Sequence, residues 1–124
     1  MSNDPAYYHA ARLREAFPLS PRATMRELLR VCRQQGIAVE WDPEIDKEGW
    51  SVNHPRPLIV LKRQRCPWVL AHEIFHALIG EALEYGIVFP FSDYADDDVE
   101  RAAERFACLL CGTFQERAQA LLEF

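Results

Sequence analysis

The segment that most constrains this 124-residue chain is a His-Glu-x-x-His pattern at residues 72–76, inside a strongly apolar stretch. Residues four apart on an α-helix lie on one face, so His72 and His76 can reach the same ion. Zn²⁺ favours imidazole nitrogen, and catalytic zinc sites combine three protein ligands with one open position. Glu73 follows the first histidine, where its carboxylate can reach a metal-bound water without binding the ion. The pattern therefore predicts a zinc hydrolase site with Glu73 as general base.

The residues around this pattern argue against a chance match. On a helix these residues would be apolar on nearly every face, so we expect a buried helix from Pro67 to about Gly80. Imidazole and carboxylate groups are costly in such a helix unless they are paired or bind a metal. The alternative interpretation is a surface helix that carries the same three residues with no metal.

A carboxylate from a later helix is the predicted third ligand. Patterns that place a third histidine six residues after the second do not apply, because Ala82 occupies that position. Glu100 lies early in a helix predicted over residues 99–110, and Glu104 follows one turn later on the same face. If Glu100 binds zinc, Glu104 can accept a hydrogen bond from the second nitrogen of a ligating histidine. The alternative is that both glutamates form surface ion pairs with neighbouring arginines.

Other residues compete for a place in this site. Asp96, Asp97 and Asp98 are rival ligands, although acidic residues just before a helix more often serve its positive N-terminal end. His54 and His9 are lone histidines near turns, a position more typical of surface residues. Tyr94 could donate to an oxyanion, although an aromatic loop more often fills a core.

The cysteines and the composition narrow the range of possible functions further. Cys108 and Cys111 could form a redox pair or half a zinc site, but three-residue spacing in an apolar helix favours packing. The formal net charge is −5, which argues against direct nucleic-acid binding. We expect no membrane span, because no apolar run approaches about 20 residues. The N-terminal segment lacks the apolar core of a secretory signal, so we expect a cytoplasmic protein.

Hydrophobic periodicity predicts one α+β domain over residues 1–124. Ser20 or Thr24 can begin the second helix, and Gly36 can end it in the left-handed conformation. Three short strands in succession predict a small, largely antiparallel sheet. The expected order is two N-terminal helices, three strands, the His-Glu-x-x-His helix, the helix with the third ligand and a last short helix. Their expected ranges are 4–17, 20–36, 37–41, 50–53, 58–62, 67–80, 99–110 and 113–124.

Two segments resemble the ImmA/IrrE family of small zinc metallopeptidases. The first is residues 70–78, and the second is residues 100–110, which carry the family's Glu, Ala, Phe-Ala and Leu-Leu positions. Glu104 stands where the family usually has asparagine, and Cys111-Gly112 replaces the usual Met-Pro ending. With the order of the elements, the resemblance covers about residues 23–112.

Family membership implies a zincin-like fold, with His72, His76 and Glu100 as zinc ligands and Glu73 as general base. It also implies a protein substrate, usually a helix-turn-helix repressor of a mobile element or stress response. The acidic residues of segment 96–104 could attract such a basic, DNA-binding substrate. The alternative function is a non-catalytic, metal-binding partner of a regulator or toxin.

Overall fold

A computed structural model describes residues 4–53, 55–82 and 97–112 of the chain. These residues form four helices and a three-stranded sheet, so the fold class is α+β. The predicted helix over 113–124 lies outside the described residues. The elements are α1 (Pro5–Ala16), α2 (Met25–Gln35), β1 (Ala38–Trp41), β2 (Gly49–Val52), β3 (Leu58–Leu61), α3 (Pro67–Ala82) and α4 (Asp97–Cys111).

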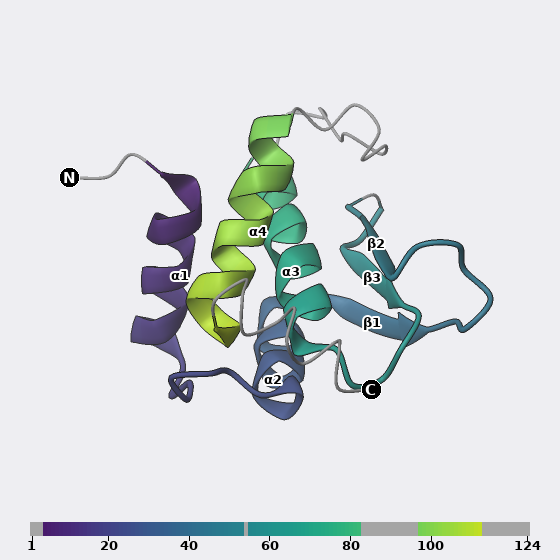
Figure 1. The fold of residues 1–124 in the computed structure, drawn as a ribbon, viewed down its shortest axis with the longest axis horizontal. Helices are drawn as coiled ribbons and strands as arrows, with labels where there is room; N and C mark the ends of the chain where they lie inside the picture. Colours follow the sequence, from purple (N-terminus) through teal and green to yellow (C-terminus); the bar gives the residue numbers. More distant parts are fainter. Residues whose placement is uncertain (1–3, 54, 83–96, 113–124) are drawn as a thin grey trace.

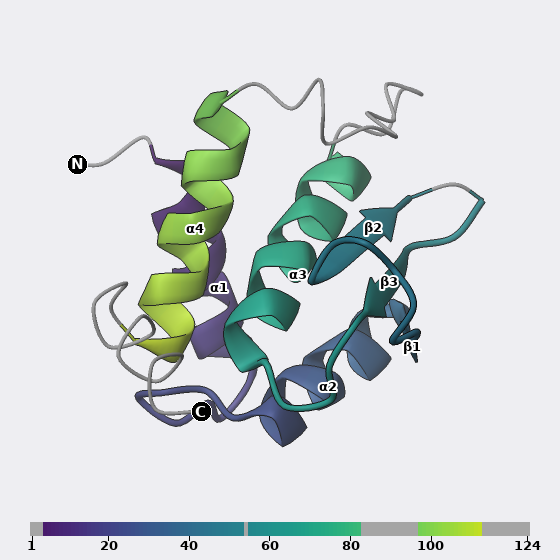
Figure 2. The same ribbon diagram turned by 45° about the vertical axis from the view of Figure 1, so that its right-hand side comes forward.

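Helix α3 lies at the centre of the molecule. It packs against α4 on one side and against β2 and β3 on the other, and α1 covers α4 on the side away from the sheet (Figures 1 and 2). Helix α2 lies across one end and contacts α3 and β1. Among the described helices, none combines the length and apolar character that crossing a bilayer requires.

The ends of α2 follow from local side-chain chemistry. Of the two predicted starts, Thr24 is the N-cap: its hydroxyl accepts a hydrogen bond from the Glu27 backbone, and Glu27 accepts one from the Thr24 backbone. The Glu27 carboxylate also accepts from the Ser20 hydroxyl at 2.8 Å, so the other candidate cap supports the same turn. Gly36 ends the helix in the left-handed region at φ 73°, as predicted.

The sheet is mixed, which corrects the prediction of a largely antiparallel sheet. The strand order is β1-β3-β2, with β3 parallel to β1 and antiparallel to β2. The chain reverses direction between β1 and β2 and again between β2 and β3, so β1 and β3 run in the same direction. They pair with each other because β3 lies between β1 and β2 in the sheet. The antiparallel prediction assumed that strands adjacent in sequence are neighbours. β3 takes the central position because it is the most apolar strand and can be buried on both faces.

The core lies where α3 meets α4 and the sheet. Phe75 and Phe106 are fully buried, and their ring centroids are 5.3 Å apart. Small residues on α4, at positions 102, 103 and 107, are also buried and allow the two helix backbones to approach closely. This close packing matters for function because each helix carries part of the candidate site.

Two side chains near the start of the chain hold α1 against α4. The Asp4 carboxylate accepts from the Arg105 guanidinium at 2.8 and 3.0 Å and also caps α1 through the Ala6 backbone. The Arg14 guanidinium donates to the carbonyls of Leu109 and Leu110 at the end of α4. These bonds fix the helix that carries Glu100 and Glu104 to the N-terminal part of the fold.

Candidate metal centre

Three predicted ligands come together between α3 and α4. The Nε2 atoms of His72 and His76 are 3.3 Å apart, and each lies 3.0 Å from a carboxylate oxygen of Glu100. The three ligand atoms that these residues offer all lie within 4.8 Å of one another. The histidines are one turn apart on α3, and Glu100 projects from the first turns of α4.

This arrangement is suited to a cation. Two imidazole nitrogens with about 2.0–2.1 Å bonds to one tetrahedral ion would be about 3.3 Å apart, which is the separation observed here. The Glu100 Oε1 atom is buried and makes no hydrogen bond of acceptable geometry, although His76 Nε2 is 3.0 Å away. A carboxylate oxygen in this state is costly without a positive partner. An ion between the three side chains would supply that partner.

The electrostatics differ between the two histidines. Burial lowers the pKa of His76, and the nearby charge of His72 lowers it further, so its ring is neutral and able to bind metal at pH 7. Burial also acts to lower the pKa of His72, but the carboxylates of Glu104, Glu73 and Glu100 outweigh it and raise that pKa. Binding of a metal through Nε2 would require the neutral form of the His72 ring.

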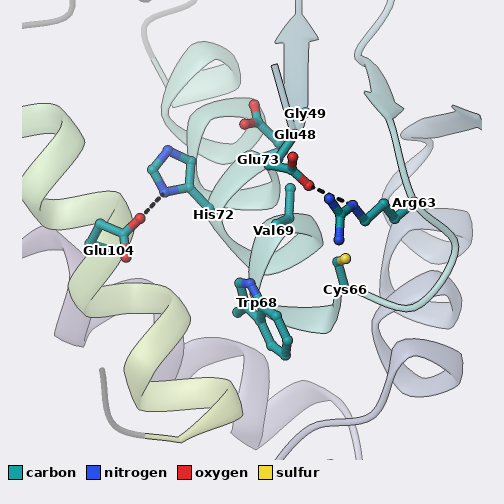
Figure 3. Close-up of a pocket in the computed structure, with 9 residues that line it drawn as sticks. All are labelled: Glu48, Gly49, Arg63, Cys66, Trp68, Val69, His72, Glu73 and Glu104. Atoms are coloured by element: carbon teal, nitrogen blue, oxygen red, sulfur yellow. Dashed lines mark ion pairs between the residues drawn. The ribbon is translucent and has the colours of Figure 1, made fainter. Parts of the chain in front are cut away.

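Glu104 contacts His72 from the other side of the ring. Its Oε1 atom lies 3.2 Å from His72 Nδ1, and Figure 3 shows the two side chains pointing toward each other. A neutral imidazole that donates through Nδ1 has its lone pair on Nε2, the atom that faces Glu100. Glu104 therefore favours the tautomer that can bind a metal. Each of the two glutamates has a carboxylate oxygen within ion-pair distance of a ring nitrogen of His72.

Glu73 is the one buried charged residue in the described part of the chain, at 8% exposure. Burial raises the pKa of its carboxyl group, while His72 and a hydrogen bond with Ser51 of β2 act in the opposite direction. A raised pKa brings a carboxylate closer to the range in which a general base works at neutral pH. A buried carboxylate with a shifted pKa beside a candidate metal site is typical of catalytic positions.

A pocket of about 420 Å³ opens beside His72 and Glu73. Figure 3 shows its lining side chains arranged around one hollow. Gly49 lines it where β2 begins, and a Cβ atom there would lie 2.9 Å from a methyl group of Val69. Glycine at this position therefore lets β2 approach α3 closely. The lining residues are Glu48, Gly49, Arg63, Cys66, Trp68, Val69, His72, Glu73 and Glu104.

Of the remaining histidine, tyrosine and aspartate candidates, only His9 has a described side chain, and it does not join the cluster. His9 stacks edge-on against Phe75, with ring centroids 6.0 Å apart. His54, Tyr94 and Asp96 lie outside the described residues, and Asp97 and Asp98 are the first two residues of α4. Cys108 and Cys111 are thiols on α4 and belong to no metal cluster found among the described residues; Cys111 packs against the core.

Sequence reasoning missed most of the pocket. Trp68 precedes His72 by four residues on the same helix, and this spacing is the one signal that could have placed it beside the site. Glu48 and Arg63 lie in the segments next to β2 and β3, and the sheet topology brings them to α3. Cys66 directly precedes α3.

Comparisons with protein-family models, with curated proteins and with solved structures found no match to this chain.

Proposed function

We propose that this chain is a zinc-dependent endopeptidase, with His72, His76 and Glu100 as the metal ligands and Glu73 as the general base. The observation that carries the proposal is the convergence of two imidazoles and one carboxylate beside a buried glutamate that is adjacent in sequence to the first histidine. Two neutral nitrogen ligands and one oxygen ligand are typical of catalytic zinc, and they leave a coordination position for water or substrate.

The arrangement of elements supports the same reading. The helix with both histidines packs on a sheet, a second helix supplies the carboxylate, and the strand β2 lies against the first helix near Glu73. This is what a zincin-like fold of the ImmA/IrrE type requires, and the resemblance of residues 70–78 and 100–110 to that family points the same way.

Each residue has a defined part in the proposed reaction. When bound, the zinc ion would supply Lewis-acid polarisation of a peptide carbonyl and lower the pKa of a water. Glu73 accepts a proton from the water that attacks the carbonyl carbon, and it delivers that proton to the leaving amine nitrogen as the C–N bond breaks. Glu104 holds the His72 ring through Nδ1, which would leave Nε2 available to a bound ion. Ser51 restrains the Glu73 carboxylate through their hydrogen bond.

We further propose a helix-turn-helix transcriptional repressor as the substrate, on the strength of the family resemblance. The net charge of −5 suits a basic, DNA-binding partner. Such a substrate would place the activity in the cytoplasm.

The test is cleavage of a repressor encoded beside this gene. The wild-type protein with zinc should cut it at one or a few positions. The Glu73→Gln variant should retain zinc and lose at least about 10²-fold in rate, because it lacks a general base. The His72→Ala variant should lose both zinc and cleavage. Cleavage by Glu73→Gln at the wild-type rate would refute the mechanism. Binding of the repressor with no cut product would instead support a non-catalytic partner.

A further inference from the structure

One face of α2 carries positive charge in a chain whose formal net charge is −5. Arg26, Arg30 and Arg33 are all exposed. Residues at these spacings lie within about 60° of one another around a helix of about 3.6 residues per turn, so the three side chains form a single arginine face. Segment 40–48, by contrast, holds five carboxylates and one lysine. The negative net charge is therefore an average over unlike surfaces and does not describe this face.

The three guanidinium groups of the arginine face are available to a partner. In the part of the chain that the structure describes, no hydrogen bond or ion pair engages them. Arg14 and Arg105, in comparison, bond to other segments of the chain. The one carboxylate of α2 belongs to Glu27, which accepts from the Thr24 backbone at the start of the helix. Like charges one turn apart on a helix repel, so a partner that neutralises all three is attracted to this face.

The rest of α2 argues against two classes of partner. Leu28, Val31 and Cys32 are buried in the core, so no apolar face is left to insert into a membrane. None of the large apolar side chains that are exposed in the described residues lies on α2. A typical protein interface has an apolar, often aromatic centre, which this face therefore lacks. A polar, positively charged surface is typical of contacts with nucleic acid, and α2 lies at the lower edge of the molecule in both views (Figures 1 and 2).

The length and chemistry of the arginine face suit a phosphate backbone. From Arg26 to Arg33 the helix rises about 10 Å along its axis. A duplex strand carries one phosphate per about 3.4 Å, so about three phosphates fall within that length. A guanidinium group can bind two phosphate oxygens through parallel N–H donors. Helix α2 contains no aromatic residue on which an unpaired base could stack, which favours a duplex over a single strand.

We propose that the arginine face of α2 binds the phosphate backbone of a nucleic-acid duplex without reading its sequence. The inference goes beyond the proposed peptidase function and does not depend on it. Its consequence for that function is one of position, because a peptidase held on DNA would meet a DNA-bound repressor at raised local concentration.

Fluorescence anisotropy of labelled duplexes tests the proposal. The full chain would be titrated into DNA and RNA duplexes of arbitrary sequence at several salt concentrations. We expect a dissociation constant of roughly 10⁻⁴ M or lower in about 50 mM salt. The logarithm of the association constant should fall against the logarithm of salt concentration with a slope of about −3, because about three phosphates are neutralised. Equal affinity for the two duplexes would support a contact with phosphate alone, and a preference for one would identify the nucleic acid that is bound.

Variants of the arginine face locate the contact. The triple variant Arg26→Gln, Arg30→Gln and Arg33→Gln should bind the DNA duplex at least about tenfold more weakly, with a salt slope close to zero. The triple variant with lysine at the same positions keeps the three charges and should recover most of the affinity. Because glutamine and lysine are good helix formers and these positions are exposed, both variants should keep the wild-type melting temperature within a few degrees.

The matched control removes three positive charges from exposed positions on other elements. Arg12→Gln, Lys47→Gln and Arg56→Gln together should leave the affinity for the duplex within about threefold of the wild type. If this control weakened binding as much as the glutamine variant of the arginine face, the overall charge would govern the affinity and the proposal would be overturned.

Other outcomes would overturn the proposal as well. These are a wild-type protein that binds neither duplex, and a glutamine variant of the arginine face that binds with wild-type affinity. Tighter binding of polyglutamate, or of phosphatidylserine vesicles, than of either duplex would assign the face to an acidic protein or a membrane instead. Glu73→Gln should bind the duplex as the wild type does, so failure of the peptidase proposal and failure of this one are separate observations.

Discussion

His72 Nδ1 lies 3.2 Å from Glu104 Oε1, while Nε2 of the same ring lies 3.0 Å from Glu100 Oε2. One imidazole therefore connects two carboxylates that are one turn apart on α4. The contact on the Nδ1 side sets the tautomer, and the contact on the Nε2 side belongs to the candidate metal centre. Since α3 and α4 meet at this ring, we expect metal binding at the candidate centre to be coupled to the packing of the two helices.

Removal of the Glu104 carboxylate should weaken metal binding without abolishing it. We expect Glu104→Ala to raise the zinc dissociation constant by about 10- to 100-fold, because the His72 ring loses its orienting acceptor. Glu104→Gln should have a smaller effect, since its amide oxygen can still accept a hydrogen bond. Competition with a zinc-binding dye would measure this, with Glu15→Gln on the exposed surface of α1 as control. Wild-type affinity in Glu104→Ala would show that the contact plays no part in binding.

Gly80 and Asn53 should be energetically coupled. A Cβ atom at Gly80 would overlap the side-chain amide of Asn53, which donates to the His76 carbonyl at 3.5 Å. Alanine normally stabilises a helix by about 1 kcal/mol relative to glycine. We therefore expect Gly80→Ala to destabilise the wild type by about 1 kcal/mol, and to stabilise the Asn53→Ala variant. Urea denaturation of the four proteins would measure the coupling, and additive effects would contradict it.

The pairing of Asp4 with Arg105 should make stability depend on pH at the acid end. The hydrogen bond with Arg105 holds the pKa of Asp4 below its usual value of 3.8. A carboxyl group whose pKa is lower in the folded state than in the unfolded state stabilises the fold at pH values above its unfolded-state pKa. That stabilisation is lost as the pH falls through its folded-state pKa.

Asp4→Asn keeps a cap acceptor for α1 and removes the charge. Because the Arg105 side chain is exposed and water screens the pair, we expect a loss of only about 0.5 kcal/mol at pH 7. The difference from wild type should shrink as the pH falls below 3.8. Thermal melts between roughly pH 2.5 and 7 would measure this difference in stability between Asp4→Asn and wild type. A difference that does not change with pH would show that ionisation of Asp4 does not contribute to stability.

Arg14 should contribute more to stability than its neighbour Arg12. The Arg14 guanidinium donates to the Ser20 carbonyl at 2.9 Å and to the Leu109 carbonyl at 3.1 Å, which joins three segments of the chain. Within the described part of the chain, the hydrogen bond and the cation–π contact of Arg12 are both with Tyr8 of its own helix. We expect Arg14→Ala to cost about 1–2 kcal/mol and Arg12→Ala about 0.5 kcal/mol or less. Equal losses of unfolding free energy in the two variants, measured by chemical denaturation, would contradict this prediction.

The helical part of the site could be predicted from sequence because its geometry is local. The spacing of His72 and His76 places them on one face of any helix, and the apolar residues around them identify that helix as buried. Glu100 and Glu104 could be proposed for the same reason, because they also share a face. That Glu100 meets both histidines depends on the packing of α3 against α4, which the structure supplies.

The sheet and the pocket depend on contacts between distant segments. The order β1-β3-β2 could not be read from three strands in succession, because strand pairing is a long-range choice that alternation of side chains does not specify. The same topology brings Gly49 and Ser51 to α3. Periodicity carries no information on such contacts, so the pocket wall opposite Trp68 could not be predicted.

We propose that His72, His76 and Glu100 hold one zinc ion, and direct metal analysis tests this ligand set. Purified protein equilibrated with zinc and then freed of excess metal should contain one equivalent per chain, measured by elemental mass spectrometry. Glu73→Gln should also contain one equivalent, whereas His76→Ala and Glu100→Ala should contain well under half, because each lacks a ligand. A wild-type protein without zinc, or a His76→Ala variant with a full equivalent, would contradict the assignment of these three residues as zinc ligands.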